Sequence, residues 1–182
     1  RKLPYYEGVI AFNNKQYSKA VRKFEEFFSR KWRDEIYDVK EIAELLKGYT
    51  DSIYRLVQMG KYTKVAEAVL EDTKKYGKKN KYMQSVRERI AYFELELLSG
   101  ENSLESYLLL EDKIVKFKKD FKDTIYKGRV DYLLGMAFVA NKKKKAGRTL
   151  FNQILQDASI SEHIKELVKT ELSLLNIKER TI

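Results

Sequence analysis

Apolar residues recur along most of this chain at steps of three and four, which is the spacing of one face of an α-helix. Residues 5–28 establish the pattern. An apolar first segment is followed by the polar break Asn13-Asn14-Lys15-Gln16, and the break is followed by a second segment with an apolar stripe. The pattern predicts two short helices joined by a tight turn. The stripe of the second helix consists of Tyr17, Ala20, Val21, Phe24 and Phe28.

Gly8 lies within the first of these two predicted helices. Glycine inside a helix costs about 1 kcal/mol relative to alanine. Its presence therefore suggests that another helix passes too close to leave room for a side chain. Ala20 is the small residue of the second helix at the expected crossing point. The sequence thus predicts close packing of the two helices at Gly8 and Ala20.

The same rhythm of stripe, polar break and stripe returns along the rest of the chain. The breaks recur every 40 to 46 residues, a period that is typical of stacked pairs of helices. About four antiparallel pairs are therefore expected, at residues 4–32, 34–78, 80–120 and 122–158. Ser103 is expected to be the N-cap of the second helix of the third pair.

One further helix is predicted at the C-terminal end, over residues 161–179. Ser161 is a suitable N-cap and Glu162 suits the first turn, where a carboxylate meets the positive end of the helix dipole. Because this helix has a single apolar stripe, we expect it to cover the exposed core of the last pair. The stripe consists of Ile164, Leu167, Val168, Leu172 and Leu175.

Several small and aromatic residues fall at the signature spacing of a known repeat family. Gly8, Tyr17, Ala20 and Phe24 match in the first pair, and the fourth pair repeats the match at Gly135, Phe138, Ala146-Gly147 and Phe151. The chain therefore resembles the tetratricopeptide repeat (TPR) family. The pairs are elongated relative to the family's period of about 34 residues. Pro4 and Glu7 depart from the family pattern, since they replace its tryptophan and leucine.

The resemblance implies an all-α fold, an α-solenoid of about four helix pairs that forms a single domain over residues 1–182. The long period also fits HEAT-type repeats, which are the alternative at the level of fold. The composition agrees with an all-α fold, because one proline and 8 glycines are too few for the turns of an all-β protein.

The composition and the first residues of the chain say little about the cellular compartment. No run of about 18 apolar residues is present, so no transmembrane segment is expected, and no signal peptide is visible. The chain begins with Arg1, so we expect it to be a piece of a longer protein. The absence of cysteine fits either the cytoplasm or a periplasmic or envelope-associated bacterial protein.

The sequence offers little that could carry catalysis. His163 is the only histidine and there is no cysteine, so neither a metal site nor a thiolate nucleophile is expected. Phosphate-binding glycine loops are absent. We therefore expect a non-enzymatic protein without a cofactor, and an enzymatic role would need residues outside this sequence.

Binding is the function that the resemblance implies. In TPR proteins the first helix of each pair lines a concave groove that holds a peptide or a helix of a partner. Family members that bind acidic C-terminal tails use a lysine and an asparagine where this chain has Tyr5 and Val9, so an apolar or aromatic ligand is expected. The alternative is that these side chains pack within the superhelix. The groove positions would be Tyr5, Val9, Phe12, Thr50, Tyr54, Val57, Arg87, Ile90, Glu94, Tyr132, Met136 and Val139.

The expected function is a protein–protein interaction scaffold or adaptor. By analogy with the family, the setting would be a bacterial envelope, secretion or motility assembly. The sequence does not identify the partner.

The charge suggests a second function, because the net charge is +10. If the pairs stack, the links between them form one basic ridge, with Lys142–Lys145 on the opposite edge. Such a ridge would attract an acidic protein, an acidic lipid surface or nucleic acid, or it is simply solvated. Nucleic acid is the less favoured partner because no known nucleic-acid-binding motif is present. The ridge would contain Lys31, Arg33, Lys74, Lys75, Lys78, Lys79, Lys81, Lys118 and Lys119.

Overall fold

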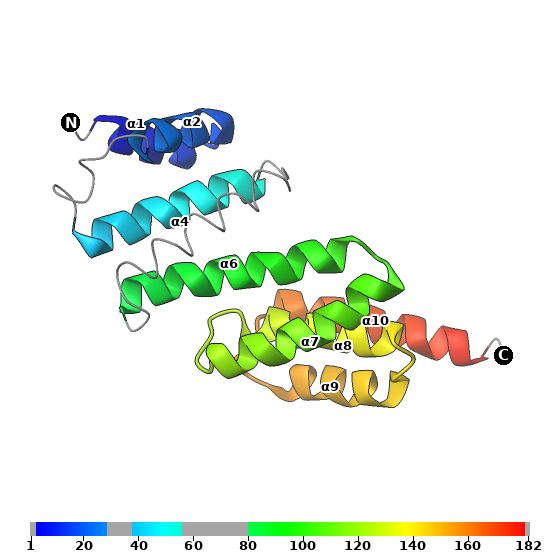
Figure 1. Ribbon diagram of the computed structural model, residues 1–182. Coiled ribbons are helices and arrows are strands. Elements are labelled where there is room, and N and C mark those ends of the chain that lie inside the picture. Colours follow the sequence, from blue (N-terminus) through cyan, green and yellow to red (C-terminus); the bar gives the residue numbers. More distant parts are fainter. Residues whose placement is uncertain (1–2, 29–37, 56–79, 181–182) are drawn as a thin grey trace. The chain divides into compact units, whose positions relative to one another are not determined.

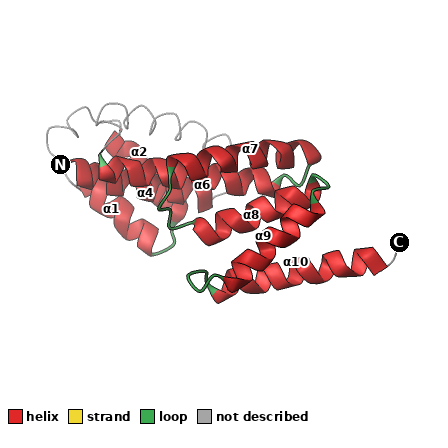
Figure 2. Ribbon diagram, turned by 90° about the horizontal axis from the view of Figure 1, so that it is seen from below, coloured by secondary structure: helices red, strands yellow, loops and turns green. Residues whose placement is uncertain are grey.

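A computed structural model of the chain describes residues 3–28, 38–55 and 80–180. Within these ranges all regular secondary structure is helical (Figure 2), which confirms the predicted all-α class. The described helices are α1 (Leu3–Asn13), α2 (Tyr17–Phe28), α4 (Val39–Arg55), α6 (Lys81–Gly100), α7 (Leu104–Asp120), α8 (Lys127–Ala140), α9 (Lys144–Gln156) and α10 (Glu162–Arg180).

The chain divides into two compact units, residues 1–90 and residues 91–182, and the boundary falls inside α6. The second helix of the predicted second pair, after residue 60, lies outside the described residues. The four-pair solenoid and the single domain therefore stay predictions.

In the first unit, α1 and α2 form a helical hairpin that packs against α4 (Figure 1). The ring of Phe24 is 1 % exposed and lies between two glycines. A Cβ atom at Gly8 of α1 would overlap this ring, and one at Gly48 of α4 would lie 3.2 Å from its Cζ atom. The close packing predicted at Gly8 is therefore present, and the atoms that fill the space belong to Phe24.

In the second unit, α8 and α9 form a hairpin that packs against α7 on one side and α10 on another. The ring of Phe151 is fully buried and takes the place that Phe24 has in the first unit. A Cβ atom at Gly135 of α8 would overlap this ring. The core of the unit also contains residues of α10, namely Ile164, Val168 and Leu175.

The two hairpins share one backbone design, in which each residue of the second lies 127 positions after its counterpart in the first. In the first turn, the Lys15 N–H donates to the Phe12 carbonyl at 2.9 Å and the Gln16 N–H to the Ala11 carbonyl at 2.8 Å. The second turn repeats both bonds, from Lys142 to Val139 and from Lys143 to Phe138, at 3.1 and 2.8 Å. The φ angles of Lys15 and Lys142 are 58° and 62°, so both turns use the left-handed region at the same position.

The predicted helix starts also agree with the structure. Ser103 caps α7 through a reciprocal capping box, in which its hydroxyl accepts from the Ser106 N–H at 3.0 Å and its own N–H donates to the Ser106 hydroxyl at 3.1 Å. Helix α10 begins at Glu162, directly after Ser161, and ends within a residue of the predicted position.

Alanine at Gly8 or Gly135 should destabilise the protein, although alanine is the better helix former by about 1 kcal/mol. The buried Phe24 and Phe151 rings have no free space to move into, so we expect a loss of about 1–3 kcal/mol in the free energy of unfolding. Urea denaturation followed by circular dichroism measures it. Gly100→Ala is the matched control, because no atom lies within 4 Å of that Cβ position. Stabilisation at Gly8 and Gly135 would show that the crossings are loose.

The substitution Val168→Ala, which removes two methyl groups from α10, tests whether this helix covers the core. Val168 is fully buried, whereas Leu174 on the same helix is 47 % exposed. Val168→Ala should lower the free energy of unfolding by about 1–3 kcal/mol through lost burial and a cavity. Leu174→Ala should change it by less than about 0.5 kcal/mol. Equal effects in the same denaturation experiment would mean that α10 does not dock on α8 and α9.

Candidate functional site

A pocket of about 350 Å³ lies in the first unit. Helix α1 supplies three lining residues, all of which are predicted groove residues. Helices α2 and α4 and the first part of α6 supply the remaining lining residues. The lining residues are Tyr5, Val9, Phe12, Phe24, Glu44, Lys47, Gly48, Asp51 and Arg89.

One wall of the pocket is apolar and aromatic. Tyr5, Val9 and Phe12 follow each other at steps of four and three, which places them on one face of α1. All three are half-buried, so each keeps surface that faces the pocket. The Tyr5 ring packs against Phe27 with a centroid distance of 6.2 Å. Burial raises the pKa of Tyr5, with smaller contributions from Glu41 and Glu44, so its hydroxyl stays protonated at neutral pH.

The opposite side of the pocket is polar and balanced in charge. Glu44, Lys47 and Asp51 share one face of α4, and Lys47 Nζ lies 2.9 Å from a Glu44 oxygen. Asp51 Oδ1 lies 2.7 Å from Arg89 Nε of α6. Both of these atoms are buried, and neither has a well-aligned hydrogen bond.

The pKa of Asp51 agrees with this incomplete pairing. Burial raises it, and the attraction of Arg89, Arg55 and Lys47 offsets the rise only in part. The side chains of Asp51 and Arg89 are 17 % and 29 % exposed, so both keep some surface in the pocket although the Oδ1 and Nε atoms themselves are buried. The sequence reasoning missed both residues, although the spacing of Glu44, Lys47 and Asp51 already indicated a shared face.

The other predicted groove residues of the first unit do not all reach this pocket. Thr50 is fully buried, and its hydroxyl donates to the Leu46 carbonyl at 2.8 Å, so it belongs to the core and offers no open surface. Ile90 is buried as well. Tyr54 is half-buried, and Arg87 donates to the Gln84 side chain at 3.3 Å. Val57 lies outside the described residues.

In the second unit, α10 contacts Tyr132, the first of the α8 residues that were expected to line a groove. Tyr132 is 9 % exposed, and its hydroxyl donates to Glu171 of α10 at 3.5 Å. Met136 and Val139 pack against the core. Glu94 forms an ion pair with Lys113 at 3.4 Å. Tyr132, Met136 and Val139 are the counterparts of Tyr5, Val9 and Phe12. Tyr132 is buried where Tyr5 is half-buried, whereas the other two positions are half-buried in both units.

The structure describes three residues of the predicted basic ridge. Lys118 Nζ lies 2.5 Å from Asp131 Oδ1, so this charge is paired. Lys81 lies over the ring of Tyr82, with Nζ 5.0 Å from the centroid, and Lys119 is exposed. The remaining predicted ridge residues lie outside the described residues: Lys31, Arg33, Lys74, Lys75, Lys78 and Lys79.

A partly buried polar network holds α6 to α8 within the second unit. Arg129 Nε and Nη2 donate to the two Glu96 oxygens at 2.7 and 2.9 Å, and the Tyr92 hydroxyl donates to Glu96 as well. Tyr92 stacks on Tyr126 with ring centroids 3.9 Å apart. Burial alone would raise the pKa of Glu96, but the hydrogen bonds from Arg129 and Tyr92 outweigh it and hold the pKa below its usual range.

Neither a metal site nor a membrane span emerges from the described residues. No group of three histidine, cysteine, aspartate or glutamate side chains is placed to hold a metal ion in these ranges. None of the described helices combines the length and apolar character needed to cross a membrane. No family model, curated protein or solved structure matches the chain. Its function is therefore inferred from its own residues.

Glu96→Gln should destabilise the protein in a pH-dependent way. Because the folded state lowers the pKa of Glu96, the ionised carboxylate stabilises the fold above its unfolded pKa, and this stabilisation is lost as the pH falls through the folded value. At pH 7 we expect a loss of about 1–2 kcal/mol, since the variant leaves Arg129 without its charged partner. The difference between wild type and variant should shrink below pH 4.5.

Urea denaturation at neutral and acidic pH measures this dependence. Glu166→Gln is the control, because Glu166 is 65 % exposed in its pair with Lys169 and such pairs contribute little. A pH-independent difference for Glu96→Gln would mean that the network does not depend on the charge of Glu96.

Proposed function

We propose that the protein is a non-enzymatic interaction module of the TPR type that holds a segment of a partner protein in the pocket of the first unit. The observation that supports it most directly is the composition of that pocket. Aromatic and apolar residues of α1 line it together with a charge-balanced set from α4 and α6, in which Asp51 and Arg89 pair at 2.7 Å and keep partly exposed side chains. Binding pockets in proteins commonly combine a mainly apolar lining with a few polar groups that fix orientation.

The two hairpins support a repeat architecture of this type. They share the same turn hydrogen bonds and the same left-handed turn residue, and in both a phenylalanine ring packs on a glycine. A design repeated at two places in one chain is expected of a repeat protein. The full solenoid of four pairs is part of the proposal.

The pocket chemistry defines the kind of segment that would bind. An apolar or aromatic side chain of the partner would pack between Tyr5, Val9 and Phe12. Backbone or side-chain polar groups of the same segment would contact the exposed parts of the Asp51 and Arg89 side chains. Because the polar wall carries two acidic and two basic side chains, binding should depend little on salt. By family analogy, we place such a partner in a bacterial envelope, secretion or motility assembly.

Tyr5→Ala tests the pocket, with its neighbour Tyr6→Ala as the matched control. Tyr5 lines the pocket, whereas Tyr6 does not line it and is 49 % exposed. We would select peptides from a random display library against the full chain and measure their affinity for both variants. Loss of an aromatic anchor should weaken binding about tenfold or more for Tyr5→Ala, and Tyr6→Ala should stay within about twofold. Equal loss in both variants would place the binding surface elsewhere.

Salt dependence separates this proposal from the basic-ridge alternative. Capture from a lysate of the source organism, run at low and high salt, should retain the same proteins if the pocket carries the binding. Anion binding through the ridge predicts nucleic acid or acidic lipid that is lost at high salt. Capture of such anionic ligands alone at low salt, and their loss at high salt, would favour the ridge over the pocket.

A further inference from the structure

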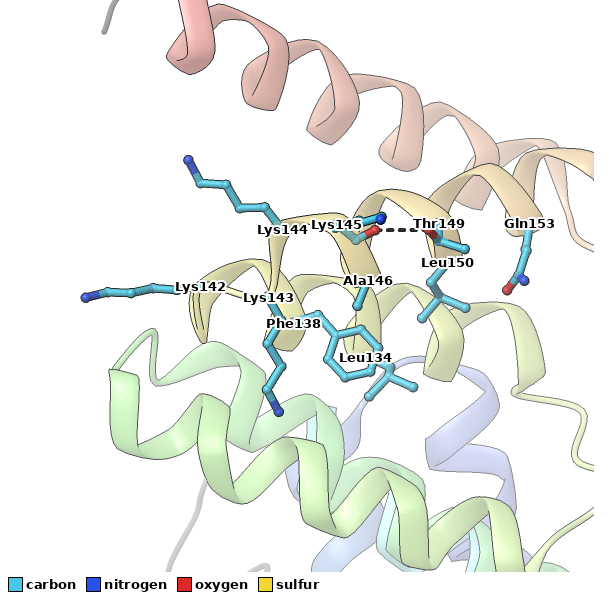
Figure 3. Close-up of a pocket in the computed structure, with 10 residues that line it drawn as sticks. All are labelled: Leu134, Phe138, Lys142, Lys143, Lys144, Lys145, Ala146, Thr149, Leu150 and Gln153. Carbon is cyan, nitrogen blue, oxygen red and sulfur yellow. Dashed lines mark hydrogen bonds between the residues drawn. The ribbon is translucent and has the colours of Figure 1, made fainter.

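A second hollow lies on the α8–α9 hairpin, at the end that carries the turn. It is an open groove of about 640 Å³, formed by the last turns of α8, the turn itself and the first turns of α9 (Figure 3). It is separate from the α1 pocket and lies entirely within the second unit. Its lining residues are Leu134, Phe138, Lys142, Lys143, Lys144, Lys145, Ala146, Thr149, Leu150 and Gln153.

The floor of this groove is apolar. The side chains of Leu134, Phe138, Ala146 and Leu150 point toward a common space in Figure 3. Phe138 and Leu150 are only partly buried and pack against the core from its edge. The floor therefore offers recessed apolar surface that an apolar side chain can cover.

The rim of the groove is cationic and largely uncompensated. Lys143 pairs with Glu111 of α7 at 2.7 Å. The exposed residues Lys142, Lys144 and Lys145 form no ion pair with any described residue, and the first two extend away from the hairpin in different directions (Figure 3). None of the ten lining residues is acidic. The pocket of the first unit differs in this respect, because its acidic and basic groups balance.

Neither the lysines nor the apolar floor is required by the hairpin itself. The first hairpin makes the same turn with Gln16, Tyr17 and Ser18 at the places of Lys143, Lys144 and Lys145. Only the left-handed residue, Lys15 or Lys142, is lysine in both turns.

The floor differs in the same way. Leu134 and Leu150 correspond to Glu7 and Lys23, which form an ion pair at 2.6 Å across the first hairpin. One backbone thus carries a salt bridge in the first unit and an apolar groove ringed by cations in the second. The hairpin backbone alone does not require this change, although Leu134 and Leu150 also pack in the core of the second unit. A ligand for the groove would account for the apolar surface and the lysines together.

We propose that this groove binds an acidic amphipathic segment of a partner protein. Leucine- or phenylalanine-like side chains of the segment would occupy the floor, and flanking aspartates and glutamates would face Lys142, Lys144 and Lys145. Charge complementarity selects the acidic flanks, and burial of the apolar side chains holds the complex together.

Two other anionic partners fit the groove less well. Single-stranded nucleic acid needs open aromatic faces for base stacking, but Lys143 Nζ lies 5.8 Å over the Phe138 ring centroid. A membrane surface is entered by protruding apolar side chains, whereas Leu134 is buried here and Phe138 and Leu150 pack against the core.

The test uses the full chain and a fluorescein-labelled synthetic peptide with two leucines four positions apart among aspartates and glutamates. One comparison peptide has serine in place of the leucines, and another has glutamine and asparagine in place of the acids. Fluorescence anisotropy near physiological salt, where the screening length is about 8 Å, measures the affinities. Both comparison peptides should bind at least about tenfold more weakly.

Variants of the protein locate the site. The triple variant Lys142→Gln, Lys144→Gln and Lys145→Gln should bind the acidic peptide about tenfold or more weakly than the wild type. Lys19→Gln with Lys40→Gln and Lys116→Gln removes the same charge from exposed sites elsewhere and should stay within about twofold. Leu150→Lys introduces on the floor of the groove the residue type that the first hairpin has at this position, Lys23. It should weaken binding although it adds a positive charge.

Three results would overturn the proposal. Tighter binding by Leu150→Lys, or equal binding of the serine peptide, would mean that only charge matters. Equal losses of peptide affinity in the two triple lysine variants would mean that the binding site is not in this groove. Failure of the acidic peptide to bind, with polyuridine RNA or phosphatidylglycerol vesicles bound through the rim lysines, would assign the groove to those ligands. If Leu150→Lys does not fold, the serine peptide makes the same distinction.

Discussion

The packing of a phenylalanine ring on a glycine is the constraint on which each unit depends. Phe24 lies against Gly8 and Phe151 against Gly135, and in both cases a single Cβ atom would overlap the ring. The contact sets how closely the two helices of a hairpin approach, because both rings are fully enclosed. In the first unit Phe24 also touches Gly48, so the same ring sets the distance to α4.

The two units use one hairpin in different ways. In the first, the face that bears Tyr5, Val9 and Phe12 lines a pocket. The Glu7–Lys23 ion pair occupies the positions at which the second hairpin has its groove. In the second, α10 covers Tyr132, and the opposite face is open between Leu134 and Leu150. A shared backbone therefore presents two surfaces of different chemistry, one balanced in charge and one cationic.

Much of the local structure could be predicted from sequence, because helix periodicity, caps and small residues are local signals. The α1–α2 and α8–α9 hairpins, the Ser103 cap and the extent of α10 agree with their predictions. The burial of individual groove residues could not be predicted. Thr50 shares the helix face expected to be open, yet it lies within the core. The sequence likewise does not show that Lys118 meets Asp131, since the two residues are 13 positions apart on different helices.

The sequence by itself determined the all-α class, the positions of the hairpins and the glycines at their crossings. These features depend on residues within one or two turns of helix, where spacing alone specifies which side chains share a face. Only the tertiary structure decided which faces stay open. The covering of Tyr132 requires α10 to return onto α8, and the pairing of Asp51 with Arg89 requires α4 and α6 to lie together. Such long-range contacts depend on how helices stack, which no local pattern specifies.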